Sequence, residues 1–332
     1  MAVMSKRERL KAILSGKPVD RVPVAFWRHW PGDDQSPESL AAVALDFQQR
    51  YDLDFIKLPV SSAYTVTDYG VKHEYRGSLI GDRVHLEYAI KNIEDWGRIK
   101  PLDINRGTYG WHLDALRTII KQKEPETPVI VTMFNPLSIA AYLAGDDTCL
   151  SHLRSHPERV EPAVKALAET GADFARAAIN AGADGIFFST RFASYELMGE
   201  AEYRQYGCPG DLAVLQAAKD GWLNVLHLHG QYPMLAQLAD YPVQALNWHD
   251  RTTQFDLTEG SRLFGGILMG GVEQYTTLRF GSPDDVKLQV HDAIRQLHGR
   301  RLVVTPGCTY PLDVPHANLL ALRKAVEVQE LT

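Results

Sequence analysis

Eight short apolar runs, spread along a chain of 332 residues, constrain the fold more than any other feature of this sequence. Their apolarity is nearly continuous rather than alternating, which is typical of strands that are buried on both faces of a parallel sheet. We therefore predict eight parallel strands. The runs cover residues 21–27, 54–60, 128–134, 184–189, 223–229, 242–248, 266–270 and 301–305.

Stretches with helical character separate several of these runs. In the first of them Ser36 is a candidate N-cap and Pro37 occupies the first helical position. Strands that alternate with helices predict an α/β fold, and eight of them predict a (β/α)8 TIM barrel. We expect a single domain over residues 1–332, because the chain has no internal repeat and no low-complexity linker. The predicted helices cover residues 36–51, 157–181, 282–297 and 315–331, with an amphipathic helix within residues 1–16.

The segment 61–127 is too long for a simple connection between a strand and a helix. Within it, residues 73–75 and 83–88 flank a stretch that has Gly81-Asp82 in its turn, which predicts a β-hairpin. We expect this hairpin, inserted after the second strand, to lie over one end of the barrel.

The charge and the cysteine content argue against several classes of protein. The chain has 35 Lys and Arg residues against 41 Asp and Glu, a net charge of −6 with no block of like charge, which disfavours nucleic-acid binding and a membrane surface. No apolar run approaches the ~18 residues that cross a bilayer. Three scattered cysteines are too few for a disulfide framework and indicate a reducing compartment, so we expect a cytoplasmic protein.

Polar residues gather at the carboxyl ends of the predicted strands, where a barrel of this kind has its active site. Clustering at one end of apolar runs is hard to explain by packing, so it predicts a catalytic mouth for a small-molecule substrate. The residues at these ends are Arg28, Lys57, Asn135, Ser189, His227, His229, Asn247, His249, Asp250, Gly270, Gly271 and Cys308.

His227 and His229 form the strongest candidate site. Residues two apart on a strand share a face, so both imidazoles project to the same side at the end of one strand. Cys308 closes another apolar run and adds a thiolate. Two imidazoles and a thiolate, with a fourth position left open, match a catalytic zinc site. The alternative is two ordinary strand-end histidines and a buried thiol.

A second cluster lies at residues 247–251. His249 beside Asp250 could form an acid–base pair, although adjacent residues on a strand face opposite ways and direct pairing requires a turn. Asp250 could instead accept a hydrogen bond from a zinc-bound imidazole. Glu273, which follows a pair of glycines, is a candidate fourth ligand or base.

Residues 5–10 and 18–24, Ser-Lys-Arg-Glu-Arg-Leu and Pro-Val-Asp-Arg-Val-Pro-Val, resemble the start of uroporphyrinogen decarboxylase-like proteins. The resemblance continues to the last predicted helix. It implies a (β/α)8 barrel with one of two chemistries. One is metal-free decarboxylation of uroporphyrinogen, and the other is zinc-dependent methyl transfer from a corrinoid protein to a thiol such as coenzyme M.

Four residues resemble active-site residues of the decarboxylase branch: an arginine that holds porphyrinogen carboxylates, an acid that contacts the pyrrole nitrogens, a tyrosine and a serine. The second arginine of that branch falls near Gly32, and its C-terminal histidine is here Cys308. A substrate with eight carboxylates would therefore lack a bidentate partner. In the same order, the four matching residues are Arg28, Asp54, Tyr142 and Ser189.

The methyltransferase branch accounts for Cys308. That branch carries His-x-Cys at the end of one strand and a second cysteine in a Pro-Gly-Cys or similar turn, and this chain has His227-x-His229 and Pro306-Gly307-Cys308. The resemblance implies zinc held by these three side chains, a corrinoid protein as partner and, by family analogy, a homodimer. An imidazole in place of a thiolate removes one negative charge from the ligands, which makes the metal a stronger Lewis acid.

The favoured hypothesis is zinc-dependent methyl or one-carbon transfer, or demethylation, on a small molecule. Arg28 and Tyr142 would orient the substrate, and Asp250 would support a ligand histidine. The first alternative is metal-free decarboxylation of a porphyrinogen or a smaller carboxylated substrate. The second is a barrel that binds a small molecule or a tetrapyrrole without catalysis.

Overall fold

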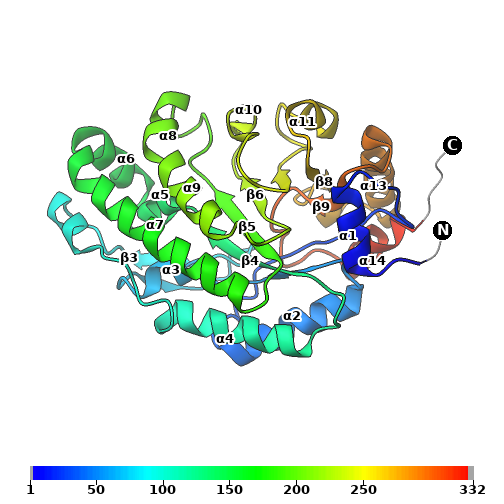
Figure 1. Cartoon of the computed structure of the whole chain (residues 1–332), viewed down its shortest axis with the longest axis horizontal. Helices are drawn as coiled ribbons and strands as arrows, with labels where there is room; N and C mark the ends of the chain where they lie inside the picture. Colours follow the sequence, from blue (N-terminus) through cyan, green and yellow to red (C-terminus); the bar gives the residue numbers. More distant parts are fainter. Residues whose placement is uncertain (1–2, 328–332) are drawn as a thin grey trace.

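Seven parallel strands form the central sheet of the protein, whose structure is a computed structural model that describes residues 3–327. Each strand pairs with the next strand of this sheet in chain order, and Figure 1 shows the helices arranged around them. Because all pairs are parallel, the carboxyl ends of the strands lie on one rim. The strands are β1 (Ile56–Leu58), β4 (Val129–Phe134), β5 (Gly185–Thr190), β6 (Val225–Leu228), β7 (Ala245–Trp248), β8 (Ile267–Val272) and β9 (Leu302–Pro306).

The first predicted strand, over residues 21–27, is reduced to a single bridge between Val24 and Val304. The backbone N–H of Ala25 donates to the carbonyl of Val304, and the N–H of Asp54 donates to the carbonyl of Val24. This segment therefore lies between β9 and β1 and completes the predicted (β/α)8 barrel. A regular strand over 21–27 is wrong because Pro23 has no N–H to donate and the N–H of Val24 bonds the Asp54 carboxylate.

The predicted helix starts at Ser36 and Ser282 are confirmed, since each hydroxyl accepts a backbone N–H three residues on. The last helix ends at Ala325, and residues 328–331 of its predicted range lie outside the described residues, as do Met1 and Ala2. The longer helices are α1 (Lys6–Leu14), α2 (Pro37–Tyr51), α4 (Gly107–Gln122), α5 (Pro136–Ala144), α6 (Asp146–Ser155), α7 (Pro157–Asn180), α9 (Cys208–Ala217), α13 (Pro283–Leu297) and α14 (His316–Ala325). The shorter ones are α3 (Tyr64–Thr67), η1 (Ile93–Arg98), α8 (Glu200–Tyr206), α10 (Leu235–Leu238), α11 (Leu257–Leu263) and α12 (Thr277–Phe280).

The hairpin predicted after the second strand is present as β2 (Lys72–Glu74) and β3 (Val84–Glu87), which pair antiparallel. Gly81 lies in the connection with φ +79°, a conformation that glycine adopts without strain. Residues 85–88 of the hairpin line the large pocket described below, so the insertion forms part of one wall of the active-site mouth.

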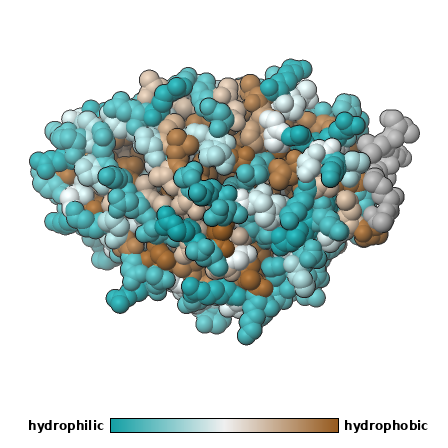
Figure 2. Space-filling model, in the orientation of Figure 1, coloured by the Kyte–Doolittle hydropathy of each residue, from teal (hydrophilic) through white to brown (hydrophobic). Residues whose placement is uncertain are grey.

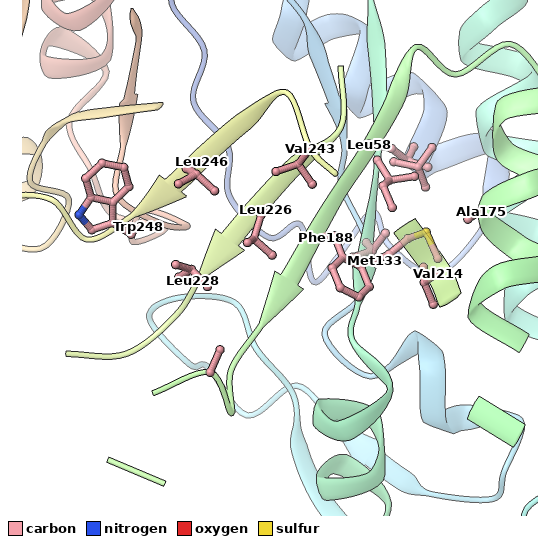
Figure 3. Close-up of a cluster of buried hydrophobic side chains, with 14 of the residues drawn as sticks. Leu58, Met133, Ala175, Phe188, Val214, Leu226, Leu228, Val243, Leu246 and Trp248 are labelled. Atoms are coloured by element: carbon pink, nitrogen blue, oxygen red, sulfur yellow. The ribbon is translucent and has the colours of Figure 1, made fainter. Parts of the chain in front are cut away.

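Successive side chains of each strand enter two different cores. Val225 on β6 packs with Phe187 inside the barrel, whereas the next residue, Leu226, packs between the strands and the helices. Figure 3 shows Phe188, Leu226 and Leu246 in this outer layer. Burial of each such side chain stabilises the fold by about 1.5–3 kcal/mol. The same alternation decides which polar side chains point into the mouth.

Helix α1 covers the amino ends of the strands. Leu10 and Ile13 belong to the inner core, and the guanidinium of Arg9 donates to Asp54, just before β1, over 2.6 Å. The interior of the barrel is therefore filled at this end, and the open space lies at the opposite rim.

The face of the molecule in Figure 2 carries mostly hydrophilic side chains, with apolar ones in small groups between them. Among the helices within residues 3–327, none combines the length and the apolarity needed to cross a membrane.

Candidate active site

The parity of β6 directs His227 into the barrel, because Val225, two residues earlier, lies in the inner core. His227 is paired in register with Ser189 on β5 and with Asn247 on β7. Three neighbouring strands thus bring a serine, a histidine and an asparagine to one level of the barrel, directly above its apolar filling.

His227, His229 and Cys308 come together at this rim. The Cys308 Sγ atom lies 3.5 Å from Nε2 of His227 and 3.8 Å from Nδ1 of His229, and the three ligand atoms all lie within 4.8 Å of one another. Zinc–sulfur and zinc–nitrogen bonds at a tetrahedral angle put S and N about 3.6 Å apart. The donor set and its spacing therefore fit a zinc ion with three protein ligands and one open position.

Asn247 fixes the orientation of the His227 ring. Its Nδ2 lies 2.9 Å from the carbonyl of Met269, 3.2 Å from that of Pro306 and 3.3 Å from the hydroxyl of Thr305, so the amide nitrogen faces acceptors. Its Oδ1 must then be the acceptor for Nδ1 of His227, at 2.6 Å. A proton on Nδ1 leaves Nε2 of His227 unprotonated and directed at the candidate metal position.

The electrostatics of the site favour the metal-binding forms of its side chains. Burial by itself raises the pKa of Cys308, but the neighbouring imidazoles, His227 foremost, hold it well below its ordinary value. Burial lowers the pKa of His227, with a partial offset from the thiolate. A thiolate beside a neutral imidazole is the combination that zinc binds.

The imidazole of His249 lies beside that of His229. Its ring centroid is 5.3 Å from that of His229, and its Nδ1 lies 3.0 Å from Nε2 of Gln274. Burial lowers the pKa of His249, but the Cys308 thiolate outweighs this effect and the net shift is upward. Because Gln274 donates to Nδ1, the proton of the neutral ring lies on Nε2.

A cavity of about 1120 Å³ opens over the three candidate ligands. Its walls combine aromatic rings such as Phe134, Tyr142 and Phe187 with many charged and polar side chains, so the cavity suits a polar small molecule. Two of the predicted catalytic residues, Tyr142 and Ser189, lie on its lining. Burial raises the pKa of the Tyr142 hydroxyl, so this group is neutral.

The structure does not bring Arg28 or Asp54 to this cavity. The guanidinium of Arg28 stacks on Trp30 at 3.8 Å and donates to the carbonyl of Leu312. Asp54, fully buried at the amino end of β1, accepts from Arg9, from Arg21 and from the N–H of Val24. Neither the motif of Arg28 nor the strand-start position of Asp54 says which partner each side chain will find.

Asp250 and Glu273 also take up structural positions. The Asp250 carboxylate accepts the N–H of Gly271 at 3.0 and 3.1 Å, and among residues 3–327 no histidine donates to it. Burial raises the pKa of Asp250 to about 6. The Glu273 carboxylate accepts the N–H of Tyr275 and groups of Thr276, so it caps a turn instead of facing the candidate metal position. Asp250 was predicted to accept a hydrogen bond from a ligand histidine, but Asn247 is the residue that accepts one from His227.

Lys57 was predicted to lie at the mouth, but no individual role was predicted for it. It lies on β1, two positions after the inner-core residue Phe55, and therefore points into the barrel, where it lines the cavity. The signal was a lysine in the middle of an apolar run that is otherwise buried on both faces.

Known proteins match the chain along nearly its whole length. The family model described as "Uroporphyrinogen decarboxylase (URO-D)" matches residues 5–328. The "Methylcobamide:CoM methyltransferase MtbA" of Methanosarcina acetivorans is 25% identical over 336 residues, which cover 96% of this chain and 96% of that protein. The "Methylcobamide:CoM methyltransferase MtaA" of Methanosarcina barkeri is 26% identical over 339 residues, with 97% of each chain covered.

A solved structure described as a methyltransferase from Methanosarcina mazei has a TM-score of 0.85 and 25% identity, and the match covers 97% of this chain and 98% of that one. A B12-independent methionine synthase from Shewanella sp. W3-18-1, at 12% identity and a TM-score of 0.58, shares the fold. The predicted resemblance is confirmed, and the relatives at 25–26% identity are named methyltransferases, as in the methyltransferase branch. The chain belongs to the uroporphyrinogen decarboxylase (URO-D) family.

Proposed function

We propose that this protein is a zinc-dependent methyltransferase that moves a methyl group between a corrinoid carrier and a small molecule. One observation carries the proposal: His227, His229 and Cys308 meet with zinc-like spacing at the base of the large cavity. The relatives support the direction of this chemistry, because their names specify methylcobamide as the methyl source and CoM as the acceptor.

The transfer breaks the bond between the methyl carbon and the cobalt of the corrinoid, and the electron pair of that bond stays on cobalt. An electron pair of the acceptor forms the new bond to carbon, so the acceptor first loses its S–H or O–H proton to solvent or to a base. Bound zinc supplies Lewis acidity at the open position, which favours this loss of a proton.

The residues of the chain hold the acceptor in place and exclude water. Asn247 orients His227 through the 2.6 Å hydrogen bond, and Cys308 closes the ligand set from the loop after β9. Tyr142 packs its ring edge-on against Phe134, with ring centroids 5.6 Å apart, and forms an aromatic wall of the cavity. An acceptor between this wall and the ligands is shielded from bulk water.

His229 stands where the family pattern has a cysteine, and this difference bears on the acceptor. A neutral imidazole in place of a thiolate makes the ligand set less negative by one charge, so His229 would leave a bound zinc more electron-withdrawing. The acceptor would then lose its proton more readily, but its anion would be a weaker nucleophile. This balance suits an acceptor whose proton is harder to remove than that of an ordinary thiol.

Elemental analysis of protein purified without chelators or a histidine tag tests the proposal. We expect about one zinc per chain, lost in His227→Ala and in Cys308→Ala, because removal of one of three protein ligands greatly weakens binding. Cys208→Ala is the matched control, since Cys208 is a free cysteine outside the site and its loss leaves the zinc content unchanged. Wild-type protein that takes up no zinc at neutral pH would contradict the proposal.

Turnover separates the remaining alternatives. Demethylation of methylcobalamin, followed by its absorbance change with a panel of acceptors, distinguishes a methyltransferase from a barrel that only binds its ligand. The decarboxylase hypothesis is not favoured by the geometry, because Arg28 and Asp54 lie outside the cavity and only Tyr142 and Ser189 line it. Conversion of uroporphyrinogen by the metal-free protein would reinstate it.

A further inference from the structure

Lys57 is half-buried and carries its ammonium into the mouth of the barrel. Its Nζ lies 4.5 Å from the centroid of the Phe187 ring and 5.4 Å from that of Trp27. Both rings belong to the inner core, so the ammonium rests on the apolar filling of the barrel with the open cavity above it. The ring faces attract the cation, but they leave its charge unneutralised.

No residue within 3–327 pairs with this ammonium through a carboxylate or a hydrogen bond, which sets it apart from Arg9 and Arg83. Arg9 is paired with Asp54, and Arg83 with Asp34, each at 2.6 Å. Desolvation lowers the pKa of Lys57 to about 7, and the Cys308 thiolate opposes this shift in part. An anion bound beside the unpaired ammonium would favour its charged form.

The other cations on the cavity lining are already neutralised. Each of them has a carboxylate partner in an ion pair, so an incoming anion would have to displace that partner. Lys57 alone among the described lysines and arginines of the lining offers an unpaired positive charge. The neutralised pairs are Arg83 with Asp34, Lys91 with Glu87 and Arg191 with Asp146.

Lys57 also lies close to the candidate metal centre. The Phe187 ring that carries its ammonium stacks on the imidazole of His227, with centroids 5.3 Å apart and an interplanar angle of 26°. One aromatic ring therefore separates the cation from a metal ligand. A compact molecule can reach both groups at once, with its anionic end on Lys57 and its reacting atom at the open metal position.

We propose that Lys57 binds the anionic group of the substrate, and that the small molecule on which this site acts is a compact organic acid. This inference rests on the proposed function for the location of the reaction, but the anion site itself is built from Lys57, Phe187 and Trp27. A carboxylate there completes the ion pair that the chain leaves open, and the surrounding rings favour a flat, apolar body on the acid.

Binding of benzoate and of benzyl alcohol, which differ in charge and little in shape, tests the inference by calorimetry. Wild-type protein is expected to bind benzoate about 10-fold more tightly than benzyl alcohol, the size of one charge-assisted hydrogen bond. In Lys57→Met this preference disappears through loss of benzoate affinity, whereas Lys57→Arg retains it. Lys91→Met, which removes a lysine paired with Glu87, is the matched control and keeps the wild-type preference.

The measurements are made on zinc-free and on zinc-loaded protein. Preference for benzoate in the zinc-free wild type supports the anion site even if methyl transfer is never observed. A failure of the proposed function is therefore distinguishable from a failure of the anion site. Equal affinities for the two probes, no benzoate binding to the wild type, or an unchanged preference in a folded Lys57→Met would each overturn the inference. Circular dichroism confirms that the variants are folded.

Discussion

Asn247 accepts a hydrogen bond from Nδ1 of His227 at 2.6 Å, across two adjacent strands in register. The asparagine amide is itself fixed by two carbonyls and a hydroxyl at 2.9–3.3 Å, so its oxygen cannot turn away. One neutral amide thus selects the tautomer of a candidate metal ligand. A carboxylate at this position would fix the ring equally well, but it would add a negative charge to the site.

This relationship predicts that Asn247→Ala weakens zinc binding by about 10–100-fold while the three ligands remain in place. The His227 ring loses the acceptor that holds its proton on Nδ1. The proton can then move to Nε2, and a protonated Nε2 cannot bind zinc. Competition with a chromophoric chelator measures the affinity. Asn247→Asp, which keeps an acceptor, is the companion variant and should retain more of the affinity; equal loss in both variants would argue against the tautomer role.

The imidazole at position 229 predicts a spectroscopic outcome for cobalt-substituted protein. His229→Cys supplies a second thiolate to the ligand set, so the thiolate-to-cobalt charge-transfer absorption should become about twice as intense as that of the wild type. Cys308→Ser should abolish this absorption in the wild-type background. An absorption that persists without Cys308 would show that another sulfur binds the metal, since Cys149 and Cys208 are the other cysteines of the chain.

Asp54 is predicted to support stability and not catalysis. Asp54→Ala leaves Arg9 and Arg21 without their shared buried carboxylate, which should lower the free energy of unfolding by about 3–5 kcal/mol. Urea unfolding followed by circular dichroism measures this change. Zinc content per folded chain should stay at the wild-type value, because the network lies at the opposite end of the barrel. A stable Asp54→Ala that had lost its zinc would refute this assignment.

Asp211 predicts a pH dependence of stability. Its buried carboxylate accepts from Asn135, Tyr203 and Tyr241, yet burial raises its pKa from the ordinary 3.8 to about 6. The native state therefore binds this proton more readily than the unfolded chain, so the contribution of Asp211 to stability falls as the pH rises from about 4 through 6 and stays low above it.

Asp211→Asn removes this titration. The unfolding free energy of the variant minus that of the wild type should rise by about 1–2 kcal/mol from pH 5 to pH 8. Urea unfolding of both proteins at the two pH values gives the difference. A difference that does not change with pH would mean that the Asp211 carboxyl titrates alike in the folded and unfolded chain.

The nearly continuous apolarity of the runs was enough to predict seven of the strands, because strands in a parallel sheet are buried on both faces. The rule of parity placed His227 and His229 on one face, and the structure brings Cys308 to them. The strand over 21–27 was predicted from the same apolar pattern, but Pro23 together with the Asp54 carboxylate removes its ladder of hydrogen bonds.

The partners of charged side chains could not be predicted in this way. Arg28, Asp54 and Asp250 were assigned to the site by residue type and local motif, but each finds its partner on an element that is distant in sequence or across a turn. Asn247 and Lys57 gain their significance from the register of neighbouring strands, which apolar periodicity leaves open.

The position of the bridge between Val24 and Val304 has a consequence for biosynthesis. The segment that starts the barrel bonds Asp54 early in the chain, but it meets its other neighbour only when β9 is made, 304 − 24 = 280 residues later, and Cys308 follows β9 by two residues. A nascent chain that ends before β9 has neither a closed barrel nor a complete ligand set. Ring closure and the capacity to capture metal therefore arise in the same late event of synthesis, and an incomplete chain cannot sequester zinc through this triad.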